Sequence, residues 1–200
     1  MEYDNEALDS KRQELRRLVR QAVPASTRDP ERIAESVLSK FIQITPPTKP
    51  EMLIEMITAH SSGSGGGRSR KPGNIYLNWA KLMDLVPDIT IAAVGGATSP
   101  HWLLPFIGLY VWNKLWCSSK EELTETEATV ICALWKNRNN EHRITEDTGF
   151  EKTNVARTAM ELAPLSRNEF DGAVNRLLEM KCIEIKGGVI WLREWVCIRY

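Results

Sequence analysis

Apolar residues recur at helical spacing in several separate stretches of the chain. The first helix is expected over residues 4–22, where leucine and valine share one side and arginines crowd the rest. The second begins at Asp29-Pro30, an N-cap followed by proline at the first helical position. In all, the pattern predicts helices over residues 4–22, 30–42, 51–58, 78–86, 124–136, 154–162 and 166–180.

Two helix starts carry a capping box, in which a hydroxyl and a carboxylate three residues apart each bind the other residue's backbone amide. Thr124 and Glu127 form one such pair, and Ser166 and Glu169 form the other. Both helices should therefore begin at these positions. The intervening helix over 154–162 is expected to turn an apolar side of Val155, Ala159 and Leu162 inward, and Pro164 prevents its continuation.

Residues 182–186 and 189–193 flank Gly187-Gly188, a loop suited to the positive φ angles of a type I′ turn. A hairpin with this turn places Ile185 opposite Ile190, and Glu184 opposite Trp191 on the other face. A short strand at Arg143-Ile144 beside this hairpin is also expected.

This order of helices followed by a two-stranded wing resembles the winged helix-turn-helix superfamily over residues 121–195. The resemblance implies a winged-helix domain, a fold that serves both to read DNA and to dock other proteins.

Residues 61–67 contain only serine and glycine, a composition typical of a flexible linker, and a basic stretch with Arg68 and Arg70 follows. One interpretation is an ordinary tether. A second is a loop presented to a protease that cuts after Arg68 or Arg70, and a third is a linker of engineered origin.

From Ile89 to Asn113 the chain has no formal charge, a length that would allow a membrane span. Glycine and proline divide this run into halves over 89–97 and 102–116, each too short to cross a bilayer. The favoured interpretation is a buried helical hairpin between the N-terminal helices and the winged helix. The alternative is a hairpin that docks a partner or enters a membrane under some conditions.

The predicted fold is therefore mainly α. Its expected parts are an N-terminal helical module (1–60), a linker (61–73), a central apolar helical hairpin (74–118) and a C-terminal winged helix with a small β-hairpin wing (119–200).

Charge and reactive residues point away from catalysis. The chain has 26 basic and 26 acidic residues, so it has no global electrostatic footprint for nucleic acid. Its four cysteines and three histidines are too widely separated to indicate a disulfide framework or a metal site. We expect no enzyme activity, no cofactor and no metal, and the lack of a signal peptide favours a cytoplasmic location.

DNA binding has the fold in its favour and the charge against it. Residues 120–200 contain twelve basic and fourteen acidic side chains, whereas affinity for a duplex depends largely on neutralising phosphates. If the helix over 166–180 did enter a major groove, the candidate contacts are Arg167, Asn168, Asn175, Arg176 and, on the wing, Lys186.

Protein binding is the favoured hypothesis, because tryptophan and tyrosine dominate the buried anchors of interfaces. The candidate partner-binding residues are Trp191, Glu184, Trp195 and Tyr200. A simpler alternative is that the chain's own apolar hairpin covers Trp191. The leading prediction is a regulatory or adaptor protein without enzyme activity; the alternatives are a winged-helix transcription regulator and a membrane-engaging effector acting through residues 89–116.

Overall fold

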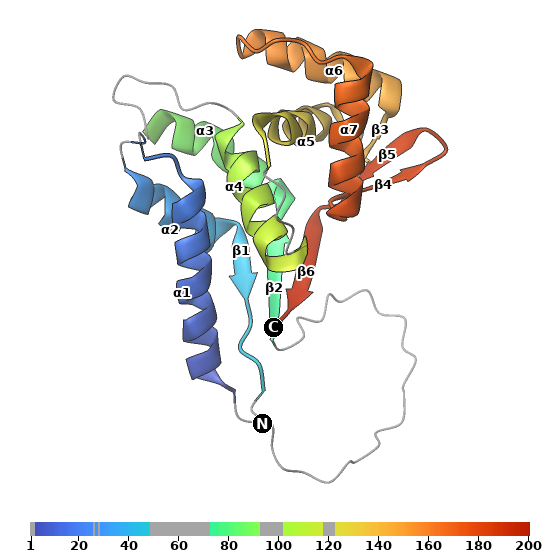
Figure 1. Cartoon of the computed structure of the whole chain (residues 1–200). Coiled ribbons are helices and arrows are strands. Elements are labelled where there is room, and N and C mark those ends of the chain that lie inside the picture. The colour runs from blue at the N-terminus through green and yellow to red at the C-terminus, as the bar shows by residue number, and fades with distance from the viewer. Residues whose placement is uncertain (1–2, 26, 28, 49–72, 93–101, 118–122) are drawn as a thin grey trace, which may run out of the picture.

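The computed structural model describes residues 3–25, 27, 29–48, 73–92, 102–117 and 123–200 (Figure 1). These residues form a mainly helical fold with two small antiparallel sheets, which confirms the predicted class. The helices are α1 (Asn5–Ala22), α2 (Pro30–Lys40), α3 (Trp79–Ala92), α4 (Leu103–Trp112), the π-helical turn η1 (Asn113–Cys117), α5 (Glu125–Asn137), α6 (Glu146–Ala159) and α7 (Arg167–Glu179). The strands are β1 (Ile42–Ile44), β2 (Asn74–Asn78), β3 (Arg143–Thr145), β4 (Ile183–Lys186), β5 (Val189–Leu192) and β6 (Trp195–Arg199).

Helices α1 and α2 begin at side-chain caps. Asp4 accepts a hydrogen bond from the Ala7 amide, and Asp29 accepts one from the Arg32 amide ahead of Pro30. The second helix was predicted to continue to Ile42, but it ends at Lys40 and the chain enters β1. Ile42 instead pairs with Leu77 in a sheet, and its side chain is buried there.

The first sheet has the strand order β1-β2-β6, so it joins the N-terminal part of the chain to its C-terminal end. The sequence pattern did not predict this sheet. No strand was predicted at 74–78 or 195–199, and Asn78 was predicted to begin a helix that starts at Trp79 instead. Each strand is only five residues long and its partner is distant in sequence. Gly73 has a φ of 73° next to this sheet, and its carbonyl accepts from the Tyr200 amide.

Helix α4 is buried in the centre of the molecule. It contacts α1 on one side and α5 on the other, with α3 also against it (Figure 1). The second half of the predicted hairpin, over 102–116, therefore does pack between the N-terminal helices and the C-terminal segment. The first half was predicted to begin at residue 89, but residues 89–92 are the last turn of α3, and 93–97 lie outside the described residues. Gly108 allows the close approach of these neighbours, since a Cβ there would lie 2.8 Å from Leu82 Cδ2 and 3.1 Å from Trp79 Cζ3.

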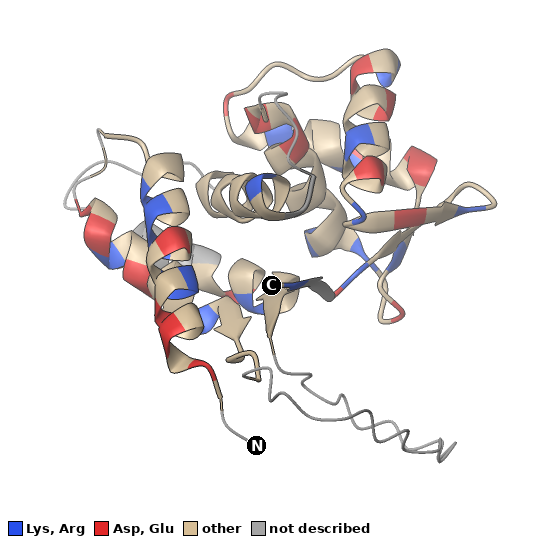
Figure 2. Cartoon of the chain, turned by 60° about the horizontal axis from the view of Figure 1, so that its bottom comes forward, with Lys and Arg blue, Asp and Glu red and all other residues tan. Residues whose placement is uncertain are grey.

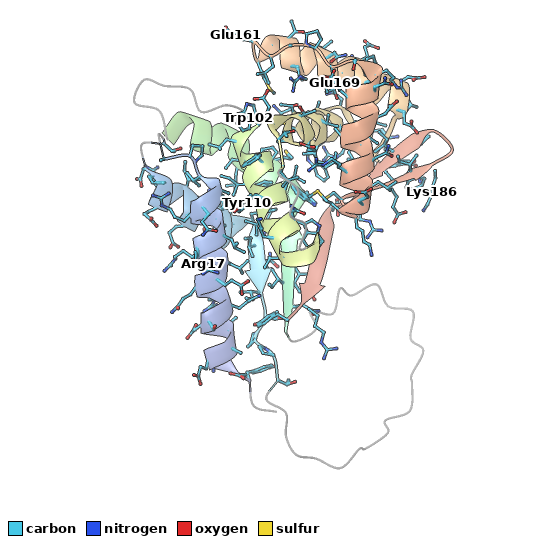
Figure 3. All side chains as sticks on the ribbon, in the orientation of Figure 1. Arg17, Trp102, Tyr110, Glu161, Glu169 and Lys186 are labelled. Atoms are coloured by element: carbon cyan, nitrogen blue, oxygen red, sulfur yellow. The ribbon has the colours of Figure 1, made fainter. Side chains whose placement is uncertain are left out.

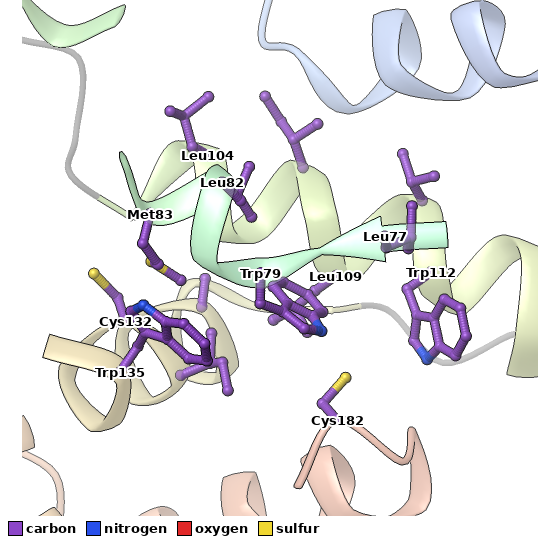
Figure 4. Packing of buried hydrophobic residues seen from close by; sticks show 14 of the residues in the cluster. Leu77, Trp79, Leu82, Met83, Leu104, Leu109, Trp112, Cys132, Trp135 and Cys182 are labelled. Atoms are coloured by element: carbon purple, nitrogen blue, oxygen red, sulfur yellow. The ribbon is translucent and has the colours of Figure 1, made fainter. Parts of the chain in front are cut away.

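A buried hydrogen bond ties α4 to the C-terminal segment. Trp112 Nε1 donates to the Met180 carbonyl oxygen at 2.6 Å, and the ring lies on the side of Cys182 (Figure 4). One buried apolar cluster contains residues of α1, α4, α5 and α7. The proposed domain boundaries at 60, 73 and 118 stay predictions, as do the helix over 51–58 and the linker with Arg68 and Arg70, which lie outside the described residues.

The predicted hairpin is confirmed in its turn and its register. Gly187 and Gly188 have φ angles of 58° and 72°, and Glu184 pairs with Trp191. Both predicted capping boxes are present, at Thr124 for α5 and at Ser166 for α7. The expected strand at residues 143–145 pairs with β5 and completes a second sheet of order β3-β5-β4.

Helix α6 differs from the prediction in its first residue and in the side that it turns toward the core. It begins at Glu146, capped by Thr145, rather than at residue 154. Its buried side consists of Gly149, Thr153 and Arg157, whereas Val155 is 60% exposed. The predicted inward face was wrong because Arg157 binds the Thr129 hydroxyl and the Ala163 carbonyl, and this polar network holds the opposite side of the helix against α5.

Within the part of the chain that the structure describes, no helix is both long and apolar enough to cross a membrane.

Candidate functional site

The sheet β3-β5-β4 has one buried face and one solvent-facing face. Ile144, Ile183, Ile190 and Leu192 are buried beneath it, so the alternate residues of the same strands point outward. Arg143, Trp191 and Glu184 lie in one row across the three strands. We call the outward set of Arg143, Glu184, Lys186, Trp191 and Arg193 the wing face; Lys186 lies toward the tip of the hairpin (Figure 3).

Trp191 lies at the centre of the wing face, half-buried beneath cations of its own sheet. The guanidinium carbon of Arg143 is 3.6 Å from the indole centroid, and Lys186 Nζ is 5.3 Å from it. Both distances are typical of cation–π contacts, which hold the ring in one orientation. These two cations therefore cover part of Trp191, whereas one alternative from the sequence was that the apolar hairpin covers it.

Glu184 links two cations of the wing face, Lys186 and Arg193. Its carboxylate accepts from Lys186 Nζ at 2.8 Å and from Arg193 Nη2. These hydrogen bonds lower the pKa of Glu184 below its ordinary value, and the one from Lys186 has the largest effect. The carboxylate therefore stays charged. Arg143 in turn pairs with Glu141 at 2.8 Å.

Arg167, at the start of α7, is surrounded by carboxylates. Its Nη1 donates to Asp147 at 2.7 Å and its Nε donates to Asp171 at 3.0 Å, while Nη2 lies 3.8 Å from Glu146. The hydrogen bond to Asp147 is the largest of the effects that raise the pKa of Arg167. This side chain therefore joins α7 to the start of α6.

Arg176, near the end of α7, is a structural contact. Its Nε lies 3.1 Å from Glu127 Oε1, and the side chain of Glu127 is only 5% exposed. Glu127 also accepts from the Thr124 amide at 2.9 Å as part of the α5 capping box. One carboxylate thus fixes the start of α5 and its contact with α7.

Asn168 and Asn175 are exposed on α7, as is Arg167, which is engaged with carboxylates. Seven residues separate the two asparagines, so they lie on one side of the helix. Glu169 lies on the same helix and forms its capping box with Ser166. The hydrogen bonds with Ser166 lower the pKa of Glu169. Figure 2 shows acidic and basic positions interspersed over the helices and the wing.

The four partner-binding candidates do not form one surface. Trp191 and Glu184 are neighbours on the wing face, but Tyr200 follows β6 of the other sheet, and its hydroxyl donates to the Thr45 carbonyl at 2.7 Å. Burial raises the pKa of Tyr200. The backbone of Trp195 pairs with Asn78, and its side chain lies outside the described residues.

Comparison of the chain with protein-family models, with curated proteins and with solved structures finds no match.

Reactive groups are sparse in the described part of the chain. No group of His, Cys, Asp and Glu side chains there is placed to hold a metal ion. Cys132 and Cys182 are buried in the core, and burial raises the pKa of Cys132, which makes it a poor nucleophile.

Arg143 is the site residue that sequence reasoning missed. The short strand at 143–145 was expected beside the hairpin, but no pairing partner was assigned to it. Placing Ile144 opposite Ile190, so that both face the core, also places Arg143 opposite Trp191. This register was the signal in the sequence that could have identified Arg143.

Proposed function

We propose that residues 121–195 form a winged helix that serves as a protein-docking unit. Helix α5, strand β3, helices α6 and α7, and the hairpin β4–β5 follow the element order of that superfamily. The sheet order β3-β5-β4 supports the same assignment, since the strand between the first two helices lies against the wing.

One observation favours a protein partner over DNA. Arg167 and Arg176 are the only Lys or Arg residues of α7, and Lys186 and Arg193 are the only ones of the hairpin over 183–193. Each of the four is paired with a carboxylate of this chain. Because duplex affinity rests on cations that neutralise phosphates, DNA binding would have to replace these pairs one by one.

The wing face has the features of an interface anchor. Trp191 is held by Arg143 and Lys186, so little side-chain freedom remains to be lost when a partner covers it. Tryptophan and arginine are enriched among the residues that dominate binding energy, and both are central here. We therefore propose a regulatory or adaptor protein without enzyme activity, acting in the cytoplasm.

A winged-helix transcription regulator is the second candidate. The exposed pair Asn168 and Asn175 favours it, because asparagine can bind an adenine edge in the major groove. The membrane-engaging alternative has less support, since eight of the ten residues of α4 are buried against other helices and would first have to be exposed. Cleavage at Arg68 or Arg70 remains a proposal for regulation.

Affinity purification of the full chain from its native lysate, with nuclease treatment and mass spectrometry, tests the docking proposal. We expect a partner protein in stoichiometric amount that is still recovered after nuclease treatment. It should not be recovered with the Trp191→Ala variant. The matched control is Arg17→Ala, an exposed change on α1 away from the wing (Figure 3). Equal recovery by both variants would reject the wing face as the docking surface.

A further inference from the structure

His142 lies at the joint between the two sheets. Its carbonyl accepts from the Leu192 amide of β5 at 2.8 Å, and its own amide donates to the Asn139 carbonyl at 3.0 Å. Glu194 lies in the connection from β5 to β6, and its carbonyl accepts from the Trp79 amide at 2.9 Å. His142 is therefore fastened to the sheet β3-β5-β4, and Glu194 to the segment where β2 passes into α3.

The imidazole of His142 lies between a cation and a carboxylate. Arg138 Nε donates to its Nδ1 at 3.0 Å, and its Nε2 is 3.0 Å from Glu194 Oε1. The ring also stacks on Trp135 of α5, with 24° between the two planes. The side chains thus form a continuous series of contacts from the end of α5, through His142, to the connection between β5 and β6.

These two polar contacts define the charge state of the ring. Arginine is always protonated in proteins, so Arg138 Nε can only donate, and Nδ1 of His142 must offer a lone pair. An ionised carboxylate can only accept, so the single proton of the ring is on Nε2 and is donated to Glu194. The observed geometry therefore requires a neutral imidazole with its proton on Nε2.

Protonation of the ring would reverse one of these contacts. A proton added at Nδ1 points toward the Nε–H of Arg138, so two donors that both carry positive charge would face each other. The contact with Glu194 would instead become an ion pair, which strengthens it. Histidine is the side chain that ordinarily changes charge between about pH 5 and 8, and solvent reaches this one, since 33% of its side chain is exposed.

Arg138, rather than His142, is placed to move. The backbone of His142 is held by hydrogen bonds at both its amide and its carbonyl, in a left-handed conformation with a φ of 59°. Arg138 is the C-cap residue of α5, and its long side chain can turn without a change in the backbone. Its Nη1 donates to the Trp135 carbonyl, and its guanidinium carbon is 4.0 Å from the Trp135 ring centroid. Neither of these contacts uses Nε, so Arg138 can lose His142 and still have a partner.

Other charges beside the joint are already paired. Glu141 and Arg143, which flank His142 in the sequence, lie 2.8 Å apart. Arg193 pairs with Glu184 on the wing face. The ring therefore responds mainly to the cation and the carboxylate that contact it.

We propose that His142 is a proton-responsive switch at this joint. In its neutral form it carries a hydrogen bond from Arg138 to Glu194 and fastens the end of α5 to the connection between β5 and β6. In its charged form it keeps Glu194 as an ion pair and releases Arg138. Acid therefore loosens the attachment of α5 at this joint, independently of any docking at the wing face.

NMR spectroscopy of the full chain, isotope-labelled at the nitrogens of histidine and arginine, tests the switch at the atoms concerned. With the ring neutral, we expect a scalar coupling across the hydrogen bond between Arg138 Nε and His142 Nδ1. The coupling should vanish as the ring becomes charged. A neutral ring without this coupling, or a coupling that persists in the charged ring, would overturn the proposal.

Solvent exchange of the Arg138 Nε–H measures the release itself. Its protection, taken relative to an unstructured arginine at the same pH, should fall by about tenfold or more over the pH range in which the ring becomes charged. His142→Asn is the matched control, because asparagine tolerates the left-handed φ and takes up no proton. In this variant we expect protection that does not change with pH.

Two results of the exchange experiment count against the switch. These are the same loss of protection in His142→Asn, and no loss in the unchanged chain as its ring becomes charged. The coupling experiment needs no variant, so it decides the question even if His142→Asn does not fold.

Discussion

Arg176→Ala tests whether the cation near the end of α7 is a structural residue. The substitution leaves Glu127 in place with its side chain 5% exposed, so a buried carboxylate loses its partner. Breaking a buried ion pair in this way costs about 3–5 kcal/mol. Because Arg176 is itself 30% exposed, water can reach the vacated side, and we expect a value near the lower limit, about 3 kcal/mol. For a chain of this length that loss lowers Tm by roughly 6–12 °C.

Urea unfolding of the full chain measures this loss. We expect a lower midpoint urea concentration, with an unchanged dependence of the free energy of unfolding on urea concentration. The double variant with Glu127→Gln removes the buried charge as well. Since Gln can still serve in a capping box, the double variant should recover part of the lost stability. Lys186→Ala is the matched control, because its exposed pair with Glu184 should leave the midpoint nearly unchanged. A loss below about 1 kcal/mol for Arg176→Ala would refute the structural role of the pair.

Three further predictions concern the core and the wing. Gly108→Ala should destabilise the chain by about 1–3 kcal/mol through overpacking against Leu82 and Trp79, as measured by urea unfolding; a stabilised variant would contradict the packing of α4. The carboxyl of Glu184 should titrate below the ordinary range in an NMR pH series, and Lys186→Met should raise its pKa. Its depressed pKa means that its contribution to stability is present above the ordinary glutamate pKa and is lost as pH falls through the folded value. Cys132 and Cys182 should resist alkylation until the chain unfolds, as read from their own peptides by mass spectrometry; rapid labelling of the native protein would contradict their burial.

Local signals in the sequence were sufficient for the hairpin and for two helix starts. Gly187-Gly188 selects the turn, and alternation of apolar residues then sets the register. The capping boxes at Thr124 and Ser166 fix helix starts through bonds within four residues. Such features depend on neighbours in the chain, which is why pattern alone predicts them.

Long-range features were not accessible in the same way. Strand β1 pairs with a strand about thirty residues later, and β6 returns from the far end of the chain. Helix α6 turns Val155 outward because Arg157 finds Thr129 and Ala163, partners that periodicity does not reveal. In both cases tertiary contacts outweighed the local apolar pattern.

The candidate site was predicted only in part, for the same reason. The hairpin register placed Glu184 opposite Trp191, but the third strand with Arg143 was needed to see how the indole is held. Asp171, four residues after Arg167, is a partner within the same helix, but Asp147 comes from α6 and Glu127, the partner of Arg176, comes from α5. The sequence did not reveal these two long-range contacts.

Titration of the full chain with duplex DNA tests most directly whether the cations of α7 and the hairpin are already occupied. Fluorescence anisotropy at two salt concentrations gives both the affinity and its salt dependence. We predict binding no tighter than the non-specific range, about 10⁻⁴–10⁻⁶ M at physiological salt, with a shallow salt dependence. A tighter affinity that falls steeply with salt, and weakens in Lys186→Ala, would contradict the protein-docking proposal and favour a DNA reader.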